Sequence, residues 1–473
     1  MRAEPLSTYS RMAEIDSIGA RHVVAVVGGA TAGAEIAHVL ASRGAFVAVF
    51  EQNQRPYGKI EDGLPRWHVK QRKDEYEEIN RRLSHPNVAF VPQTRMGRDI
   101  QFDELRQQWL FSAIVLAHGA WRDRPFPVEG ADQFVGRGLI YQNPLIYWFN
   151  HYPERAYHGP RYELPDGAAV VGGGLASIDV VKVLQIETTL KALRARGIEE
   201  DMLRLEREGI EPVLAARGLT WSGLGVRPCK LFYRRRVLDM PLSDIPADAN
   251  PKRAEALRQA RAKILDKAMR KFLFEFQELR VPTGLVVEGS GRESARESIM
   301  AGVIFSRTEI VDGKAHTLAD TAETIRAALT VSSIGSIPEP IPGIPQRGEV
   351  YTYADHKVGL LIDGPTPVFA AGNVLTGKGN IKDSLESGTQ IGVRLAEAYL
   401  GLSGESMPPL AEGARRDAHQ QGETIQSVLS HRGPLAPDQV AAVIAKVRER
   451  QRAVGFEGDY RAWIARVTPP DLQ

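Results

Sequence analysis

The chain has 473 residues, with 60 Lys and Arg against 58 Asp and Glu, and its only cysteine is Cys229. This length exceeds one ordinary core and predicts two or three domains, while 43% hydrophobic and 25% charged residues are typical of a soluble globular protein. A net charge of +2 does not favour a nucleic-acid partner, and no apolar stretch is long enough to span a membrane. One cysteine excludes an intramolecular disulfide and a cysteine-ligated iron–sulfur cluster within these residues.

The first residues predict no targeting signal. Met1–Leu6 lack the apolar core of a secretion signal, and Glu4, Glu14 and Asp16 are acids that a transit peptide avoids. We therefore expect a cytoplasmic protein.

The first predicted elements form a βαβ unit. An almost wholly apolar run at 22–27 predicts a buried parallel strand, a helix follows at 34–43, and a second strand follows at 45–50. Further elements alternate in the same way: a helix at 74–83, a strand at 88–91, a helix at 102–110 and a strand at 111–117.

The turn between the first strand and helix reads Gly28-Gly29-Ala30-Thr31-Ala32-Gly33. Gly28 allows a tight turn, and Gly33 lets the helix pack closely on the strand, so that the helix N-terminus meets a pyrophosphate. Ala30 replaces the middle glycine and adds only a methyl group. Glu51, at the end of the second strand, supplies the carboxylate expected to bind ribose hydroxyls. These features favour a dinucleotide site over a turn that is merely rich in glycine.

A second glycine-rich turn follows the strand predicted at 168–171. Gly172 and Gly174 keep two glycine positions, and Ser177 is small enough for the third. We therefore expect a second dinucleotide at the N-terminus of the helix at 178–184. Two dinucleotides on one chain indicate electron transfer from one bound cofactor to the other.

The end of the next strand, predicted at 229–233, carries no acid. Arg234, Arg235 and Arg236 stand there instead. A ribose 2′-phosphate would be repelled by a carboxylate and held by guanidinium groups, so this cluster favours NADP over NAD. The alternative is a solvated charge cluster at a strand end.

The remaining pattern predicts both helices and strands. The segments are largely exposed helix at 187–217, a long helix at 251–276, antiparallel hairpins around 285–288 and 302–307, strands at 329–333 and 367–371, and helices at 384–400 and 434–455.

Taken together, the chain resembles the adrenodoxin reductase family of ferredoxin–NADP reductases, a branch of the glutathione-reductase-like flavoproteins. The resemblance covers about residues 20 to 400. The segments that carry it are Pro56-Tyr57-Gly58, Gly97-Arg98-Asp99, Ala117-His118-Gly119-Ala120, Trp148-Phe149-Asn150-His151-Tyr152-Pro153-Glu154, Gly174-Leu175-Ala176-Ser177-Ile178-Asp179 and Ser332-Ser333-Ile334-Gly335.

The resemblance implies FAD at the first turn and NADPH at the second, with hydride passing to the flavin and single electrons leaving to an iron–sulfur protein. The implied FAD-binding residues are Gly28, Gly29, Ala30, Ala32, Gly33, Glu51, Gly58, Gly119, Gly372, Asn373, Gly379, Asn380 and Ile381. The implied NADP-binding residues are Gly172, Gly174, Leu175, Ala176, Ser177, Arg234, Arg235 and Arg236. Two departures stand beside the expected flavin: Asn373 replaces a tryptophan, and the loop that follows reads Gly-Lys-Gly-Asn rather than Gly-Pro-x-Gly.

Two further hypotheses concern a histidine and a helix. His68 lies close to the position of a family histidine near the flavin, where it would handle a proton, although a lone histidine is more often structural. The helix at 251–276 shows basic side chains with few acids between them, and the family docks an acidic ferredoxin on a comparable region. They are Arg258, Arg261, Lys263, Lys267, Arg270 and Lys271. The alternative is a solvated helix face.

We therefore predict an α/β fold with two Rossmann-like three-layer domains and a helical C-terminal extension. The FAD-binding domain is discontinuous, at 20–120 and 330–405, the NADP-binding domain is inserted at 121–329, and the extension covers 406–473. The helix at 434–455 would pack on the FAD domain, cover the flavin edge or meet a partner. Two other functions stay open: an electron-input subunit of a larger reductase complex, and a flavin-binding scaffold without significant turnover. No metal-ligand constellation is evident in the sequence.

Overall fold

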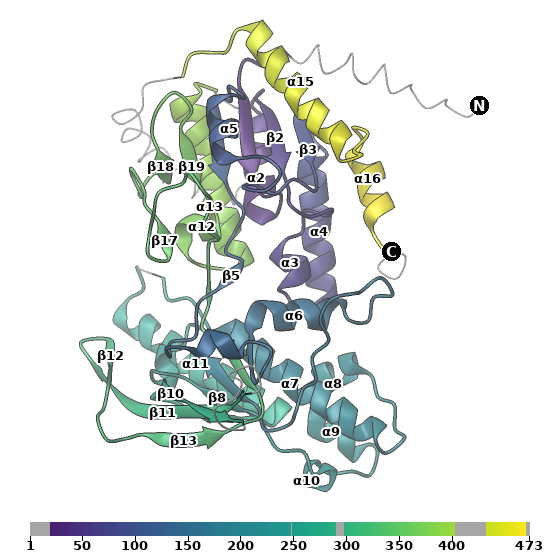
Figure 1. The fold of residues 1–473 in the computed structure, drawn as a ribbon, viewed down its shortest axis with the longest axis vertical. Helices are drawn as coiled ribbons and strands as arrows, with labels where there is room; N and C mark the ends of the chain where they lie inside the picture. The colour runs from purple at the N-terminus through teal and green to yellow at the C-terminus, as the bar shows by residue number, and fades with distance from the viewer. Residues whose placement is uncertain (1–18, 247, 290–297, 403–431, 470–473) are drawn as a thin grey trace. The chain divides into compact units, whose positions relative to one another are not determined.

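The computed structural model describes residues 19–246, 248–289, 298–402 and 432–469 (Figure 1). Within them the chain forms two compact units. The first unit comprises residues 19–61, 69–122, 337–402 and 432–469, and the second comprises residues 62–68 and the described part of 123–336.

The first unit is built on a six-stranded sheet in the order β18-β19-β4-β1-β2-β3. Its pairings are parallel except for β18 with β19. The strands are apolar on both faces because both faces of such a sheet are covered. They are β1 (Val23–Val27), β2 (Phe46–Phe50), β3 (Val88–Val91), β4 (Ala113–Leu116), β18 (Leu360–Ile362) and β19 (Val368–Ala370).

Helix α2 (Thr31–Ala41) packs closely on α13 (Ile381–Arg394). Glycines allow this approach: a Cβ on Gly388 would lie 2.8 Å from the Ala32 carbonyl oxygen, and one on Gly392 would lie 3.1 Å from Val39. The other helices are α3 (Lys59–Asp62), α4 (Val69–Leu83), α5 (Phe102–Gln107), α12 (Asn373–Thr376) and a π-helical turn at Leu395–Tyr399.

Two C-terminal helices complete the first unit: α15 (Pro437–Ala453) and α16 (Tyr460–Val467). Val443 and Val447 of α15 are buried in the core that includes the β-sheet, and α15 contacts β3. Of the three possibilities that the sequence leaves for the helix at 434–455, the structure shows packing on the first unit.

The second unit contains a parallel five-stranded sheet in the order β6-β14-β7-β8-β9. Against it lies an antiparallel sheet of β10, β11, β12 and β13, and Phe232 stacks on Phe305 at 4.1 Å between the two. The strands are β6 (Leu139–Tyr141), β7 (Ala169–Gly172), β8 (Lys230–Phe232), β9 (Glu275–Gln277), β10 (Arg280–Glu288), β11 (Ile299–Val311), β12 (Lys314–Thr317), β13 (Glu323–Arg326) and β14 (Thr330–Ser333). The antiparallel pairing of β10 with β11 confirms the predicted hairpin.

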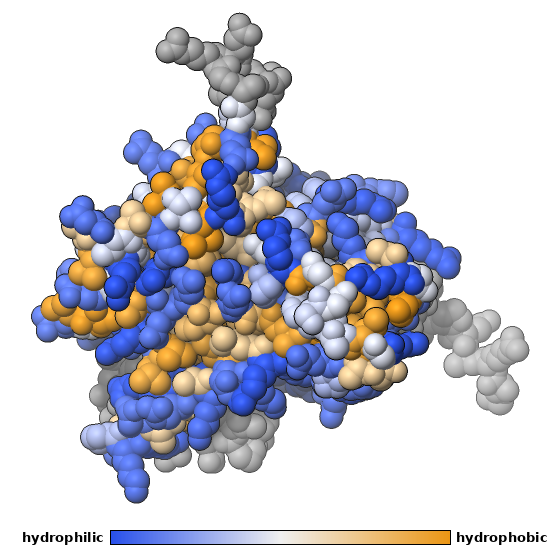
Figure 2. Space-filling model, turned by 90° about the horizontal axis from the view of Figure 1, so that it is seen from below, coloured by the Kyte–Doolittle hydropathy of each residue, from blue (hydrophilic) through white to orange (hydrophobic). Residues whose placement is uncertain are grey.

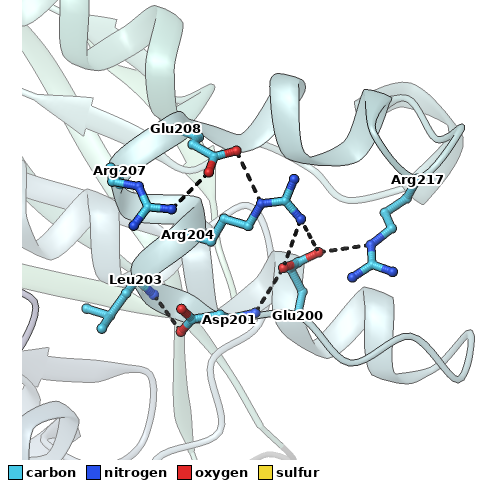
Figure 3. Close-up of polar contacts among 7 residues, drawn as sticks. All are labelled: Glu200, Asp201, Leu203, Arg204, Arg207, Glu208 and Arg217. Atoms are coloured by element: carbon cyan, nitrogen blue, oxygen red, sulfur yellow. Dashed lines mark hydrogen bonds and ion pairs between the residues drawn. The ribbon is translucent and has the colours of Figure 1, made fainter.

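The segment 187–217 is mostly helical, as predicted, but the helices are separate and the prediction that they are largely exposed is wrong. The chain turns at Gly197 and Gly209, where φ is positive, and separate helices bury Leu205 and Val213. Glu200 and Arg204 anchor an ion-pair network between these helices, drawn in Figure 3. The helices of the second unit are α6 (Gln142–His151), α7 (Leu175–Arg194), α8 (Met202–Glu208), α9 (Ile210–Ala215), α10 (Trp221–Leu224) and α11 (Pro251–Phe272), with single turns at Ala131–Phe134 and Val237–Asp239.

The boundaries of the two units differ from the predicted ones. The predicted FAD-binding segment 330–405 begins with β14, which is the strand between β6 and β7 in the second sheet, so the first unit resumes at residue 337. The segment 62–68 also clusters with the second unit. The predicted helix 251–276 ends at Phe272, and β9 follows it. Short strands complete the fold: β5 (Arg122–Asp123), β15 (Ser336–Ile337), β16 (Gln346–Arg347) and β17 (Val350–Tyr351).

The described helices include none that combines the length and apolar character needed to cross a membrane. Figure 2 shows hydrophobic residues between hydrophilic ones on one face of the molecule. Among the exposed large apolar residues are Val287, Ile299 and Val311, on β10 and β11. Scattered apolar residues of this kind are common on globular proteins.

Candidate functional site: two glycine turns

The first turn brings backbone groups closer together than any side chain would allow. Gly28 has a φ of +100°, and a Cβ there would lie 2.6 Å from the Ala117 carbonyl oxygen. A Cβ on Gly33 would lie 1.8 Å from the Gly28 carbonyl oxygen. The first glycine thus makes the turn and the last one allows α2 to approach β1, in the arrangement that dinucleotide-binding turns use.

Residues far apart in the sequence meet around the N-terminus of α2. A Cβ on Gly58 would lie 2.9 Å from the Ala30 methyl carbon, and a Cβ on Gly372, with φ of +63°, would lie 2.8 Å from the Ala32 methyl carbon. The alanines therefore face glycines, so two distant loops can approach the N-terminus of α2 closely. Ala30 precedes α2 and provides no side-chain cap for those amides. Such amides are suited to bind an anionic pyrophosphate.

Glu51 lies at the carboxyl end of β2 and is buried. Its carboxylate accepts hydrogen bonds from the Gly29 N–H at 2.8 Å and from the Asn53 N–H at 2.9 Å. These bonds fix the carboxylate beside the turn, where the sequence places the ribose.

The loop at 372–381 combines capping groups with an unpaired polar atom. The Gly372 N–H donates to Ser387 Oγ at 2.9 Å, and the Asn380 side chain caps α13 by accepting from the Asp383 N–H at 2.7 Å. Asn373 Oδ1 is buried and has no hydrogen-bond partner among the residues that the structure describes. Because buried polar atoms are nearly always paired, this oxygen fits a bound group that donates a hydrogen bond. Ile381 begins α13, and Gly379 lies beside Asn373.

A partly buried histidine adjoins the Gly119 turn. His118 Nε2 lies 3.3 Å from the Tyr351 hydroxyl, and the Trp121 N–H donates to the His118 carbonyl oxygen at 2.8 Å. Burial lowers the pKa of His118 to about 4, so its ring is neutral at pH 7. The sequence reasoning included Gly119 and missed this histidine, although the quoted motif Ala117-His118-Gly119-Ala120 contains it.

The second turn is closed on one side and open on the other. A Cβ on Gly172 would lie 2.2 Å from the Ser333 carbonyl oxygen, to which Ser177 Oγ donates a hydrogen bond at 3.0 Å. A Cβ on Gly174 would meet no atom within 4 Å. Leu175 and Ala176, which begin α7, are exposed. The open side of this turn and the first amides of α7 can therefore receive a phosphate.

The three arginines follow β8, which is the parallel neighbour of β7. Their side chains therefore lie at the same sheet edge as the second turn. Arg235 donates to the Gly313 carbonyl oxygen at 2.9 Å, Arg236 Nε lies 3.2 Å from Asp239 Oδ2, and the side chain of Arg234 is exposed. The sequence reasoning missed Asp239, which lies within 3.8 Å of Arg235 as well.

His68 precedes α4 in the segment that clusters with the second unit, and a role in proton handling stays a prediction. The more strongly paired histidine is His151. Its Nε2 lies 2.9 Å from Asp62 Oδ1, and its Nδ1 lies 2.7 Å from Glu154 Oε1. Burial lowers the pKa of His151, but the hydrogen bonds and charges of Asp62 and Glu154 outweigh burial and raise it to about 9.

We expect His151 to stabilise the second unit by roughly 2 kcal/mol at pH 6 and by little at pH 10. A raised pKa gives stability that is complete below the unfolded value of 6.5 and is lost as the pH rises through about 9. The free energy of unfolding of wild type and of His151→Gln, measured by denaturant titration from pH 6 to 10, should therefore converge with rising pH. A difference that stays constant would contradict the ion pairs.

Two Rossmann-like units, each with a glycine turn at the carboxyl end of a central parallel strand, define the class of two-dinucleotide α/β proteins. Residues 22–192 match the family described as pyridine nucleotide-disulphide oxidoreductase. The predicted fold class is confirmed, and proteins named as adrenodoxin and ferredoxin–NADP reductases among the relatives confirm the resemblance to that family.

Individual relatives cover different shares of the chain. NADPH:adrenodoxin oxidoreductase, mitochondrial, of Arabidopsis thaliana is 26% identical over 258 residues, which are 52% of this chain and 51% of that protein. The NADPH-Fe(3+) oxidoreductase subunit beta of Geobacter sulfurreducens is 32% identical over 194 residues, which are 39% of this chain and 25% of that one. The chain thus spans about half the length, or less, of these relatives. The structure of Mycobacterium tuberculosis FprA in complex with NADPH shares the fold, with a TM-score of 0.61, 18% identity and coverage of 91% and 90%.

Proposed function

We propose that the chain is an FAD-containing oxidoreductase that takes hydride from NADPH and passes single electrons to a ferredoxin-like iron–sulfur protein. The observation that carries the proposal is the pair of glycine turns, each of which leads a central parallel strand into a helix whose N-terminus has no side-chain cap. Only the strand beside the second turn is followed by an arginine cluster. The relatives named as NADPH:adrenodoxin oxidoreductase and as FprA in complex with NADPH support the assignment of NADPH.

FAD, when bound, would supply a flavin that accepts a hydride and releases electrons one at a time. The amides at the start of α2 would bind its pyrophosphate, and Glu51 would bind its ribose. Gly58 and Gly372 allow their loops to pack against the start of α2, since a Cβ on either glycine would lie less than 3 Å from an alanine methyl carbon. Asn373 Oδ1 would accept a hydrogen bond from the bound group.

The second turn would hold NADPH by its phosphates. Gly174 leaves space for the pyrophosphate at the start of α7, and Arg235 and Arg236 would bind the 2′-phosphate. Cys229 takes no part in the chemistry, because its thiol is fully buried and burial raises its pKa. Electrons would therefore leave from the flavin rather than through a thiol.

A second candidate function is electron input to a larger complex. One relative of 32% identity is itself named as the beta subunit of an NADPH-Fe(3+) oxidoreductase. In that case this chain would deliver electrons to an iron–sulfur partner that stays bound to it. Co-purification of a cysteine-rich subunit would favour this function over a ferredoxin that dissociates.

The experiment that tests the leading function is an anaerobic titration of the purified protein. NADPH should bleach the flavin absorbance at near-stoichiometric amounts, and NADH should do so only at much higher concentration. A preference for NADH would contradict the NADP assignment. A flavin that neither nucleotide bleaches would favour the scaffold, and a protein that takes up no FAD would overturn the proposal.

The structure reduces the number of basic side chains on α11 that could contact a partner. Arg261 donates to the Leu238 and Ser243 carbonyl oxygens, and Arg270 pairs with Asp266 within α11. Lys263 and Lys267 are exposed and one helical turn apart, so they present positive charge on one face. We therefore place the contact with an acidic ferredoxin at these two lysines.

Reversing the charge of Lys267 by Lys267→Glu should slow ferredoxin-coupled turnover several-fold at low salt, because opposite potentials speed encounter. Reduction of a small neutral dye should not change. Lys191→Glu reverses another exposed lysine of the same unit and should affect neither assay. Equal slowing by both variants, or slowing of dye reduction as well, would count against docking at α11.

A further inference from the structure

The C-terminal helices lie outside the family resemblance, yet they contact two turns of the first unit that flank Glu51. We propose that α15 and α16 form part of the FAD site and hold its adenosine end in place, with Trp463 and Tyr460 as positioning residues. This inference rests on the proposed FAD site at the first turn. Figure 1 shows α15 beside β3 and α16 continuing along α4.

Trp463 connects α16 to the turn after β2. Its indole N–H donates to the Gln54 carbonyl oxygen at 2.8 Å, and the side chain is only 5% exposed. Gln54 stands three residues after Glu51, and the Asn53 N–H between them donates to the Glu51 carboxylate. The tryptophan therefore holds the backbone that positions the ribose-binding carboxylate.

Tyr460 makes the second connection, through α4. Its hydroxyl lies 2.6 Å from Asn80 Oδ1, which also accepts from the Tyr57 hydroxyl at 3.2 Å. Tyr57 directly precedes Gly58, which faces Ala30 at the start of α2. One amide oxygen thus joins the C-terminal helix to the loop that closes over the first glycine turn.

An aromatic cluster lies beneath these hydrogen bonds. Phe90 packs edge-on against Tyr460 at 5.2 Å and against Phe456 at 6.1 Å, and Phe456 contacts Trp463 at 5.6 Å. Phe90 is fully buried, and its ring edge would lie 3.5 Å from a Cβ on Gly29. The cluster therefore extends from α16 to the glycine turn itself.

Helix α15 holds the neighbouring turn, after β3. Gln451 Nε2 donates to the Phe90 carbonyl oxygen at 2.8 Å, and Arg450 Nε donates to Thr94 Oγ1 at 3.0 Å. The Thr94 N–H in turn donates to the Glu51 carbonyl oxygen at 2.8 Å. Both helices therefore bind backbone at the carboxyl ends of β2 and β3.

The direction of a bound dinucleotide places its adenosine in this region. The pyrophosphate lies at the turn after β1, and the carboxylate at the end of β2 binds the adenosine ribose. Since β3 is the next strand in the sheet, the adenine follows toward the ends of β2 and β3. These are the two turns that α15 and α16 hold, whereas the flavin half of FAD extends the other way, toward β4 and Gly372.

The experiment compares three ligands on the full-length, flavin-free protein, with the second turn saturated by NADP⁺. FAD spans the site, ADP occupies only its adenosine end and FMN lacks adenosine. Trp463→Phe removes the N–H donor and keeps a ring, and Tyr460→Phe removes one hydroxyl. We expect each variant to weaken the binding of FAD and of ADP by about the same factor, roughly tenfold, because one buried polar group near the adenosine end loses its hydrogen-bond partner. The binding of FMN should not change. Dissociation constants come from flavin fluorescence quenching and, for ADP, from calorimetry.

Val443→Ala is the matched control, because Val443 is a buried residue of α15 that packs in the core. It should lower the thermal unfolding temperature and leave all three dissociation constants unchanged. The inference would be overturned if the aromatic variants weakened FMN binding as much as FAD binding, or if Val443→Ala weakened FAD binding equally. It would also be overturned if neither aromatic variant changed any dissociation constant. Wild-type protein that binds no FAD would instead overturn the proposed function, so the two failures are distinguishable.

Discussion

Replacing Arg235 and Arg236 together by alanine is expected to raise the KM for NADPH about a hundredfold and to leave the KM for NADH unchanged. A charge-assisted hydrogen bond is worth about 1.5–3 kcal/mol, so two guanidinium groups at the lower end of this range give about 3 kcal/mol, or roughly a hundredfold. NADH lacks the 2′-phosphate and loses nothing. Both side chains lie at the edge where β8 follows β7, the strand of the second glycine turn. Steady-state reduction of a small dye with each nucleotide measures the two KM values.

Asp239 provides the matched control for this cluster. Its carboxylate lies 3.2 Å from Arg236 Nε and within 3.8 Å of Arg235, so it competes with a phosphate for the same donors. Asp239→Asn should therefore lower the KM for NADPH a few-fold, opposite to the arginine variant. If removal of the arginines changed the KM values for NADPH and NADH equally, or changed neither, the cluster would be a solvated group of ion pairs rather than a phosphate site.

The elements that could be predicted from the sequence are those in which every residue has the same surroundings, such as strands buried on both faces. The strands β1, β2, β3 and β7 are apolar on both faces, so their position follows from composition alone. The boundary of the second unit could not be predicted in the same way. β14 and β19 are both short buried strands that end near a glycine, and only pairing with β6 and β7 assigns β14 to the second sheet.

The site shows the same division between local and long-range information. Gly28, Gly33 and Gly172 could be assigned because a turn constrains its own residues. The roles of Asp239 and of the Trp463 indole N–H could not be assigned, because their hydrogen-bond and ion-pair partners are set by the fold. Asn373 was visible only as a departure from the family pattern, and its unpaired oxygen required a structure.

Two alanine substitutions in the second turn are expected to separate folding from binding. Gly172→Ala places a methyl group 2.2 Å from the Ser333 carbonyl oxygen, which belongs to the neighbouring strand and cannot move away without breaking the pairing of β7 with β14. We expect a loss of about 3 kcal/mol in the stability of the second unit, which corresponds to a fall of roughly 10 °C in its unfolding temperature. Differential scanning calorimetry of the whole chain measures it.

Gly174→Ala should give the opposite result, because its Cβ meets nothing within 4 Å and its φ of −92° is available to alanine. The unfolding temperature should stay within a few degrees of wild type, while NADPH binds about tenfold more weakly, since the methyl group occupies the open side that the phosphates approach. Flavin bleaching at limiting NADPH reports the affinity of the folded variant. If Gly174→Ala binds NADPH as wild type does, the pyrophosphate does not lie on the open side of this turn. The assignment of the arginine cluster to the 2′-phosphate would then lose its main support, which is the neighbouring pyrophosphate site.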